Sequence, residues 1–524
     1  ETICFIFIEM ASILEEGNIS SVYESFEIAY EKNKDNISLN KDDYKIINDF
    51  FKTLGNSGVT GQERIFSLAL DNIDINYIIS SEQQRDRMLH TPIPRLILSL
   101  CLPTLATQLI SVFYNTADTY FVSKLSTSAS AAVGVVFSLM SIIQAFGFGI
   151  GMGCGSIISR SLGSRDNERA DRTASSAFFF AAAVGLLICI AGLCTLRPLM
   201  RLLGSTETIL PYSESYARII LLAAPVMCAS FVLSNVLRAE GEATLSMYGM
   251  CVGGLLNVGL DPLFIFVFEM GIAGAALATA LSQLVSFLIL GWQFLHGRSI
   301  VRLRLQAVSR SPRDYGQILL IGFPTICRQG FASLSSALLN NAAAAYSDAA
   351  VAAVTISNKV YLLVRSMIIG IGQGFQPVAG YNFGAGSKPR TRQAFWFSTL
   401  FGTVVCVAGA ALIALFPEQI MHFFRDDPEV TRIGRQALLY ACAVMPVMAY
   451  STYVNQLYQC LGFHQAATLL ASCRNGLLYV PLILLLPGLL GLSGVAMSQP
   501  AADFLTFLVS IPFQIWFFRH KLRG

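Results

Sequence analysis

Two polar residues one helical turn apart lie within an apolar segment and could bind a cation. The segment Met250–Phe268 is long enough to cross a bilayer, and it contains Asn257 and, four residues later, Asp261. On a helix this spacing places the amide and the carboxylate on one face. A carboxylate at membrane depth costs about 2.5–3.5 kcal/mol, so it is paired, hydrated, protonated or bound to a cation. Asp261 is therefore either a protonated helix-packing residue or part of an ion site.

Only two other acidic residues, Asp118 and Asp503, lie well within apolar segments, and Glu269 lies at a segment end. Asp118 lies toward the outer end of the first segment, where helix capping is the alternative role. If Asp118 and Asp261 are close together at low dielectric, both cannot stay ionised cheaply, so a proton or a sodium ion would bind between them. Moving one charge across 100 mV supplies about 2.3 kcal/mol, which can drive a conformational change.

Basic residues also lie in apolar segments of the second half: Arg328, Lys359, Arg365 and Arg474. They could pair with Asp503, line a substrate path, or extend to the membrane interface.

The composition predicts an all-α polytopic membrane protein. Of the 524 residues, 54% are hydrophobic and only 13% are charged, against about 25% charged in a typical soluble protein. Residues 1–91 carry a net charge of −8 and residues 92–524 carry +11, which predicts a boundary near Thr91. We expect 1–91 to be a small, soluble, acidic helical extension, with amphipathic helices over Tyr44–Leu54 and Gln62–Ile79.

The sequence contains no motif that is typical of an ATP-driven pump or a zinc enzyme. The sequence has neither a phosphate-binding Gly-x-x-x-x-Gly-Lys-Ser/Thr loop nor a His-Glu-x-x-His zinc motif, so we expect no ATP-driven pumping, no enzyme activity and no cofactor. The glycine-rich run Gly147–Gly155 predicts close helix packing through small residues. The twelve cysteines lack metal-like spacing, which is typical of small buried residues. No nucleic-acid partner is expected.

Apolar segments predict twelve transmembrane helices. They fall at 96–122, 129–158, 174–195, 213–237, 245–268, 272–296, 315–345, 350–382, 394–416, 434–459, 465–488 and 492–518. The flanks and loops on one side carry more than twice as many Lys and Arg residues as those on the other side. By the positive-inside rule, we expect a multi-pass protein of the cell membrane with both termini cytoplasmic.

The transmembrane part repeats itself in one constant register. Matching residues include Pro103 with Pro324, Gly163 with Gly384, and Gly241 with Gly462. We expect two parallel-repeat lobes of six helices around a central cleft: residues 92–297, a cytoplasmic linker at 298–313, and residues 314–524. The aspartates break the repeat, since Asp118 matches Leu339 and Asp261 matches Leu482.

Residues 92–524 resemble the multidrug and toxic compound extrusion family. The matching motifs are Asp118-Thr119, Ala131-Ala132-Val133-Gly134, Arg238-Ala239-Glu240-Gly241, Asn257-Val258-Gly259-Leu260-Asp261-Pro262, Gly271–Thr279 and Gly372–Asn382. The resemblance implies a cation-coupled multidrug antiporter. It would export cationic amphipathic compounds in exchange for sodium ions or protons, by alternating access between two lobes. We expect a monomer whose partners are these small molecules and membrane lipids.

The family resemblance also implies a coupling-ion site in the amino-terminal lobe. Its ligands here would be Asp118, Asn257, Asp261 and Thr279, which would hold the proton or a sodium ion, with Asn235 on the fourth span as a neighbour. One branch of the family places further carboxylates in the second lobe. This chain has Gln329, Asn455 and Gln456 there, which favours a single site.

Residues 1–83 resemble the stage III sporulation protein AB family through Gly55, Ser57 and Gln62 between two predicted helices. Two alternative functions therefore stay open. One is a lipid-linked or polysaccharide flippase of the same wider superfamily. The other is a structural component of a sporulation assembly.

Overall fold

The computed structural model describes residues 75–425 and 427–522, and the chain divides into two compact units at Arg87 and Met88. Helix α5 (Ile75–His90) includes this boundary. The helix expected over Tyr44–Leu54, and all but the end of the one expected over Gln62–Ile79, lie outside the described residues. The second unit, Met88–Gly524, contains all the predicted spans and is described below by itself.

Among the described residues of the second unit, twelve helices are long and apolar enough to cross a membrane, as the sequence predicts. The first lobe consists of α6 (Ile93–Ser123), α7 (Thr127–Gly163), α8 (Asn167–Cys194), α10 (Leu210–Glu240), α11 (Ala243–Pro262) with the π-helix η1 (Leu263–Val267), and α12 (Gly271–Leu295). The second lobe consists of α13 (Pro312–Ala344), α14 (Asp348–Gly384), α15 (Lys388–Leu415), α17 (Pro428–Cys460), α18 (His464–Ser472) with the π-helix η3 (Cys473–Leu477), α19 (Tyr479–Leu490) and α20 (Leu492–His520).

Three short elements were not expected from the hydropathy. They are α9 (Leu196–Leu202), α16 (Pro417–Phe424) and the 3₁₀ turn η2 (Leu305–Ala307). None is long enough to span a bilayer, so a search for apolar segments of about 20 residues does not detect them.

Helix termini repeat between the lobes as closely as the sequence does. Ser126 caps α7 by accepting a hydrogen bond from the Ala129 amide, and its counterpart Ser347 caps α14 through Ala350, both at 3.0 Å. Gly241, which ends α10, has a φ of 94°, and its counterpart Gly462 after α17 has a φ of 87°. Side chains are disfavoured in this left-handed conformation, so glycine stops the fourth helix of each lobe.

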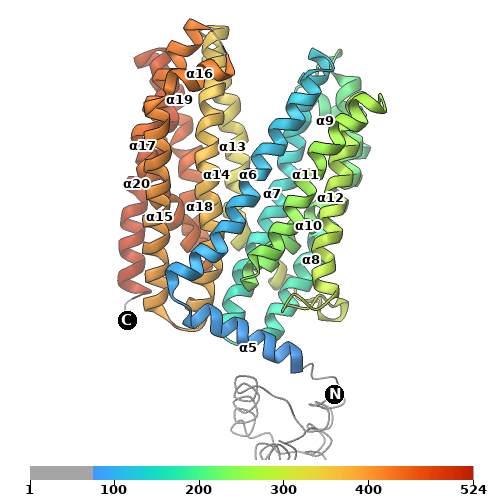
Figure 1. Cartoon of the computed structure of the whole chain (residues 1–524), viewed down its shortest axis with the longest axis vertical. Helices are drawn as coiled ribbons and strands as arrows, with labels where there is room; N and C mark the ends of the chain where they lie inside the picture. The colour runs from blue at the N-terminus through green and yellow to red at the C-terminus, as the bar shows by residue number, and fades with distance from the viewer. Residues whose placement is uncertain (1–74, 426, 523–524) are drawn as a thin grey trace, which may run out of the picture. The chain divides into compact units, whose positions relative to one another are not determined.

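The two lobes contact each other through the first two helices of each lobe (Figure 1), and glycines of α7, α13 and α14 lie at this contact. A Cβ atom added at Gly153 of α7 would overlap the Ile318 carbonyl oxygen of α13. Added at Gly384 of α14, it would overlap the Arg160 carbonyl oxygen. These glycines are needed because backbone packs directly on backbone, and the expected packing role of the run Gly147–Gly155 is confirmed.

All of these contacts lie toward the side on which α6 begins and α20 ends, which we call the basic side. It is the side that carries most of the Lys and Arg residues. Toward the opposite side the same helices have open space around their glycines. A Cβ atom added at Gly134 of α7 or at Gly330 of α13 would meet no atom within 4 Å.

Replacing Gly163 by alanine is expected to open the contact between the lobes. Its Cβ would overlap the Tyr381 carbonyl oxygen, so α7 and α14 must separate. Cys101 reports on this separation, because it is fully buried between the lobes and donates to the Ile371 carbonyl at 3.1 Å. We expect maleimide labelling of Cys101, mapped by mass spectrometry, to become at least about tenfold faster. This rate corresponds to a loss of about 1.4 kcal/mol in the free energy that keeps the lobe contact closed.

The control is Gly134→Ala on the same helix, where the added methyl group meets open space. It should leave labelling of Cys101 unchanged. Equal labelling rates in the two variants would contradict the assignment of Gly163 to the lobe contact.

The linker between the lobes is bound to the first lobe. The backbone amides of Arg302 and Ile300 donate to the carboxylates of Asp171 on α8 and Glu240 on α10, both at 2.9 Å. Glu240 of the Arg-Ala-Glu-Gly motif therefore anchors the connector.

Candidate functional site

Three helices of the first lobe bring the four predicted ion-site residues together. Asp118 lies on α6, Asn257 and Asp261 lie one turn apart on α11, and Thr279 lies on α12. Each residue lies toward the end of its helix that is farther from the basic side. The predicted spacing on α11 holds, and tertiary packing adds α6 and α12 to the same site.

Asn257 is the centre of the hydrogen bonds in this cluster. Its Nδ2 atom donates to Asp261 Oδ1 at 3.4 Å and to Thr279 Oγ1 at 3.3 Å. Asp261 is fully buried, and Asn257 and Thr279 are buried as well. The amide therefore orients one oxygen of the Asp261 carboxylate and the Thr279 hydroxyl toward each other.

One oxygen of each carboxylate lacks a partner. Asp118 Oδ1 and Asp261 Oδ2 are both buried without a hydrogen bond, and neither residue forms an ion pair within the described part of the chain. The two carboxylates are close enough to interact electrostatically. Burying such oxygens without a partner costs several kcal/mol, which a bound proton or cation would offset.

Two tyrosines that the sequence did not single out complete the cluster. Tyr216 on α10 is fully buried, and its hydroxyl oxygen lies next to Thr279 and interacts electrostatically with Asp118 and Asp261. The Tyr216 hydroxyl has no hydrogen bond of acceptable geometry within the described residues. Tyr114 lies one turn before Asp118 on α6 and interacts with the same carboxylate. Tyrosine near a span end is common at membrane interfaces, so sequence alone carried no signal for this role.

The structure corrects the expected place of Asn235. It lies more than five helical turns beyond Tyr216 on α10, about 28 Å along the helix, so it cannot join the carboxylate cluster. Its Nδ2 donates to the Phe231 carbonyl at 2.7 Å. A Cβ atom added at Gly151 would contact Asn235, and one added at the counterpart Gly372 would contact Gln456, the counterpart of Asn235. Asn235 therefore belongs to a packing contact that both lobes share.

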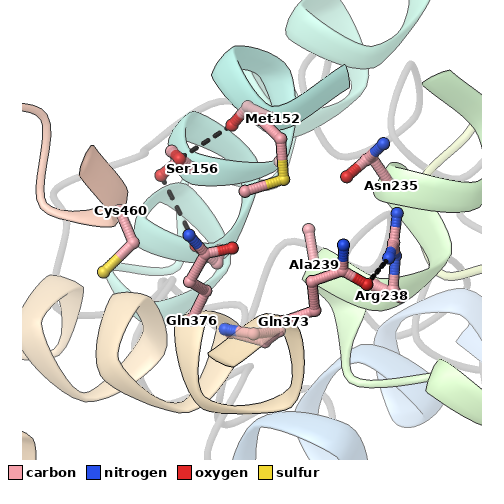
Figure 2. Close-up of a pocket in the computed structure, with 11 residues that line it drawn as sticks. Met152, Ser156, Asn235, Arg238, Ala239, Gln373, Gln376 and Cys460 are labelled. Carbon is pink, nitrogen blue, oxygen red and sulfur yellow. Dashed lines mark hydrogen bonds between the residues drawn. The ribbon is translucent and has the colours of Figure 1, made fainter. Parts of the chain in front are cut away.

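Asn235 also lines a small cavity between the lobes near the basic side (Figure 2). There Arg238 of α10 donates a short hydrogen bond to the side-chain oxygen of Gln373 on α14. This contact joins the two lobes, as does the hydrogen bond of 3.1 Å from Arg160 to the Leu461 carbonyl. The family motifs that contain Arg238 and Gln373 therefore contact each other between the lobes, away from the carboxylate cluster.

The equivalent position in the second lobe is apolar. In the register of the repeat, Asp118, Asn257 and Asp261 match Leu339, Leu478 and Leu482. Leu339 is buried in a hydrophobic cluster with Tyr479 and Ile483, and Leu478 and Leu482 pack against that cluster. The scaffold is repeated, but the oxygen cluster exists in one copy.

The donor set limits what the oxygen cluster can bind. It offers carboxylate, amide and hydroxyl oxygens, and no group of three His, Cys, Asp or Glu side chains that could hold a metal ion occurs anywhere in the described residues. Oxygen ligands suit hard cations, whereas soft thiolate and imidazole ligands suit transition metals. The unpartnered carboxylate oxygens fit a proton or a sodium ion.

Comparison with protein families agrees with this arrangement of repeats. The MatE family model matches the chain twice, at residues 103–263 and at residues 324–485, once in each lobe. The chain belongs to the MatE family. A second model, for stage III sporulation protein AB, matches residues 1–89.

The MatE relatives include transporters named for multidrug export. The multidrug export protein MepA of Staphylococcus saprophyticus is 25% identical over 427 residues, which are 81% of this chain and 92% of that protein. MepA of Staphylococcus aureus is 25% identical over 422 residues, 80% of this chain and 93% of that protein. This MatE chain is accordingly a multi-pass membrane transporter.

Solved structures of MatE-type transporters share the two-lobe fold. A multidrug resistance MATE family transporter of the MOP superfamily, solved in an outward-facing conformation, is 26% identical with a TM-score of 0.78, over 82% of this chain and 97% of that one. A MOP superfamily transporter from Pyrococcus furiosus is 25% identical with a TM-score of 0.79, over 84% and 98%. Reverse polarity of the binding pocket has suggested a different function for that protein.

Proposed function

We propose that this protein is a cation-coupled multidrug efflux antiporter, which exports cationic amphipathic compounds in exchange for protons or sodium ions. The observation that carries the coupling is the pair of buried, unpartnered oxygens of Asp118 and Asp261, present in one lobe and replaced by leucines in the other. Resemblance to MepA over four-fifths of the chain supports the export of drugs. We infer that the protein works as a monomer with both termini in the cytoplasm.

Helix α6 offers a physical link between ion binding and lobe movement. It carries Asp118 near one end. Near the other end Thr104 donates to the Gly370 carbonyl of α14 in the second lobe, at 2.7 Å. Pro103 lies between the α6 start and Asp118, where it removes a helix hydrogen bond and permits bending. An ion that pulls Asp118 toward Asp261 would thus change how α6 packs on α14.

Coupling requires that the ion and the drug prefer different lobe arrangements. A ligand shifts a two-state equilibrium only by its difference in affinity between the states, and about 5.5 kcal/mol reverses a ratio of 1:99. The free energy gained when a bound ion neutralises two neighbouring carboxylates in a buried site is of this size. Ion binding at the carboxylate cluster is therefore strong enough to shift the equilibrium between lobe arrangements, and the ion gradient supplies the energy of the cycle.

The deciding experiment is dye efflux from proteoliposomes that contain the purified full chain. A cationic fluorescent dye is loaded, and either a sodium gradient or a pH gradient is imposed alone. Efflux driven by one of the two gradients identifies the coupling ion. Efflux that neither gradient accelerates would contradict the proposal.

Residues 1–89 support a second role, because the sporulation protein AB model matches them. An antiporter needs only the unit that begins at Met88. We therefore expect a chain without residues 1–87 to retain gradient-driven efflux, within about twofold when normalised to protein in the membrane, because all candidate membrane spans found in the described residues lie between Ile93 and His520.

The measurement is the same proteoliposome assay on the shortened and full-length chains. Pull-down of partners from membranes with each chain separates the two roles. If residues 1–87 serve an assembly, the shortened chain loses a partner and still transports. Loss of transport would show that the extension belongs to the transporter.

A further inference from the structure

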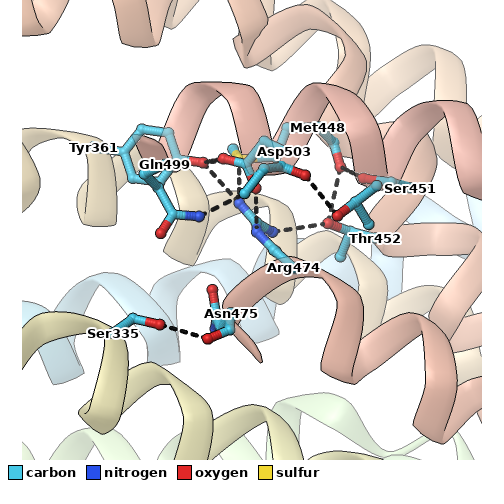
Figure 3. Close-up of polar contacts among 11 residues, drawn as sticks. Ser335, Tyr361, Met448, Ser451, Thr452, Arg474, Asn475, Gln499 and Asp503 are labelled. Carbon is cyan, nitrogen blue, oxygen red and sulfur yellow. Dashed lines mark hydrogen bonds and ion pairs between the residues drawn. The ribbon is translucent and has the colours of Figure 1, made fainter. Parts of the chain in front are cut away.

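The second lobe contains a buried ion pair (Figure 3). Arg474 of η3 lies 2.6 Å from Asp503 of α20, measured between Nε and Oδ1. Tyr361 of α14 donates a short hydrogen bond to Asp503 and accepts one from Arg474 at 2.8 Å. Gln499 also donates to Asp503, at 3.4 Å from its Oδ1 atom. The Asp503 carboxylate is therefore fully engaged.

Two further arginines lie close to this pair. Arg365 is one turn beyond Tyr361 on α14, and it interacts electrostatically with Arg474 and Asp503. Arg328 of α13 interacts with Arg474 and with Arg365. Neither Arg328 nor Arg365 has an ion pair within the described residues, and the Nε atom of Arg365 is buried without a partner there. The cluster thus has three positive charges and one negative charge.

The two unpaired arginines lie near the middle of long membrane-spanning helices. Arg328 is the middle residue of α13, which has 33 residues, and Arg365 lies next to the middle of α14, which has 37 residues. At the rise of an α-helix these positions are about 24 Å or more from the helix ends, far beyond the reach of an arginine side chain. Unpaired guanidinium groups at this depth are costly unless an anion or water reaches them.

The arginines are not part of the repeated scaffold. The corresponding first-lobe residues of Arg328, Arg365 and Arg474 are Thr107, Gln144 and Gly253, which are uncharged. The first-lobe cluster has two carboxylates without a cationic partner among the described residues, and the second-lobe cluster has an excess of cationic side chains. The two lobes therefore have opposite charge at these clusters.

We propose that Arg328 and Arg365 form a binding site for an oxyanion group, a carboxylate or a phosphate, in the second lobe. Planar guanidinium groups pair with both kinds of oxyanion through two parallel hydrogen bonds, which a spherical ion cannot match. One such group would bring the charge of the cluster close to neutral. The oxyanion belongs either to a small molecule or to a lipid headgroup. This site goes beyond the proposed antiport, which requires only the first-lobe carboxylates.

The test is ligand-dependent thermal unfolding of the purified full-length protein in neutral detergent. The probes are sodium benzoate and inorganic phosphate, with sodium chloride at matched ionic strength as the control. We expect a saturable rise in the unfolding midpoint with at least one oxyanion and none with chloride. A parallel arm adds phosphatidylglycerol or phosphatidylcholine to the micelles. Protection by the former alone assigns the site to a lipid headgroup.

Variants locate the binding. Arg328→Gln and Arg365→Gln should each raise the apparent dissociation constant at least about tenfold, since a charged hydrogen bond contributes roughly 1.5–3 kcal/mol. Arg365→Lys should bind more tightly than Arg365→Gln and less tightly than the wild type, because lysine keeps the positive charge but lacks the paired N–H donors of the guanidinium group. The matched control is Lys359→Gln, an exposed residue on the same helix, which should stay within about twofold of the wild type.

Two results would overturn the proposal. One is the absence of saturable protection by benzoate, phosphate and phosphatidylglycerol alike. The other is unchanged protection in the Arg328 and Arg365 variants. Because binding is measured without any ion gradient, either failure would leave the antiport proposal standing.

Discussion

Replacing Asp261 by asparagine is expected to abolish gradient-driven efflux, and Asp118→Asn is expected to do the same. Each change removes one carboxylate from the pair but preserves side-chain volume and helix packing. With only one carboxylate left, the site has a much lower affinity for a proton or a sodium ion. Efflux should therefore fall at least about 100-fold, which corresponds to a loss of about 2.7 kcal/mol or more in ion-binding free energy. Dye efflux from proteoliposomes under the active gradient measures the loss.

Both variants should reach the membrane in normal amounts, since asparagine has nearly the volume of aspartate and adds no charge to the buried site. The matched control is Glu269→Gln, which neutralises an exposed acid just before the start of α12 on the same side of the protein. This control should transport normally. Normal efflux from both aspartate variants would remove Asp118 and Asp261 from the coupling mechanism.

Replacing Asp503 by asparagine is expected to have the largest effect on stability. Within the described part of the chain, Asp503 is the carboxylate that pairs with Arg474 and interacts electrostatically with Arg365. Its loss leaves the buried guanidinium group of Arg474 without a counter-charge, and breaking a buried pair in this way costs about 3–5 kcal/mol. The midpoint of thermal unfolding in detergent should fall accordingly.

Removing one of the three arginines should cost less than removing the single acid. In Arg474→Gln, the nearby Arg365 can still balance Asp503, so the unfolding midpoint should fall by a clearly smaller amount. Joint replacement, Arg474→Met with Asp503→Leu, should recover much of the loss because neither member of the pair is left without its partner. Equal losses for Asp503→Asn and Arg474→Gln would show that Arg365 does not interact with Asp503 as described.

Sequence patterns alone predicted the architecture, because each pattern involves residues that are close together along the chain. A span needs about 20 consecutive apolar residues, so twelve spans could be counted directly. The duplication could be read because glycines such as Gly241 and Gly462 are required at the same backbone positions in both lobes. The helix ends in the structure differ by a few residues from the predicted span ends, because capping residues such as Ser126 lie outside the apolar segments.

The candidate ion site was predictable in part. Asn257 and Asp261 share one helix face by spacing alone, but their proximity to Asp118 and Thr279 depended on family resemblance until the helices were packed. Tyr216 was missed because an interfacial tyrosine looks the same whether it contacts lipid or a carboxylate. Asn235 was misplaced because membership of the right helix does not determine depth along it.

By itself the sequence determined how many membrane-spanning helices this protein has, how they repeat, and which copy carries the paired acids. Only the tertiary structure decided that Asp118 lies within electrostatic range of Asp261, that Arg238 joins the lobes, and that Arg365 interacts with the Arg474–Asp503 pair. Charge interactions depend on distances of a few ångströms between residues that are tens to hundreds of positions apart. Helix packing sets those distances, and no local pattern encodes them.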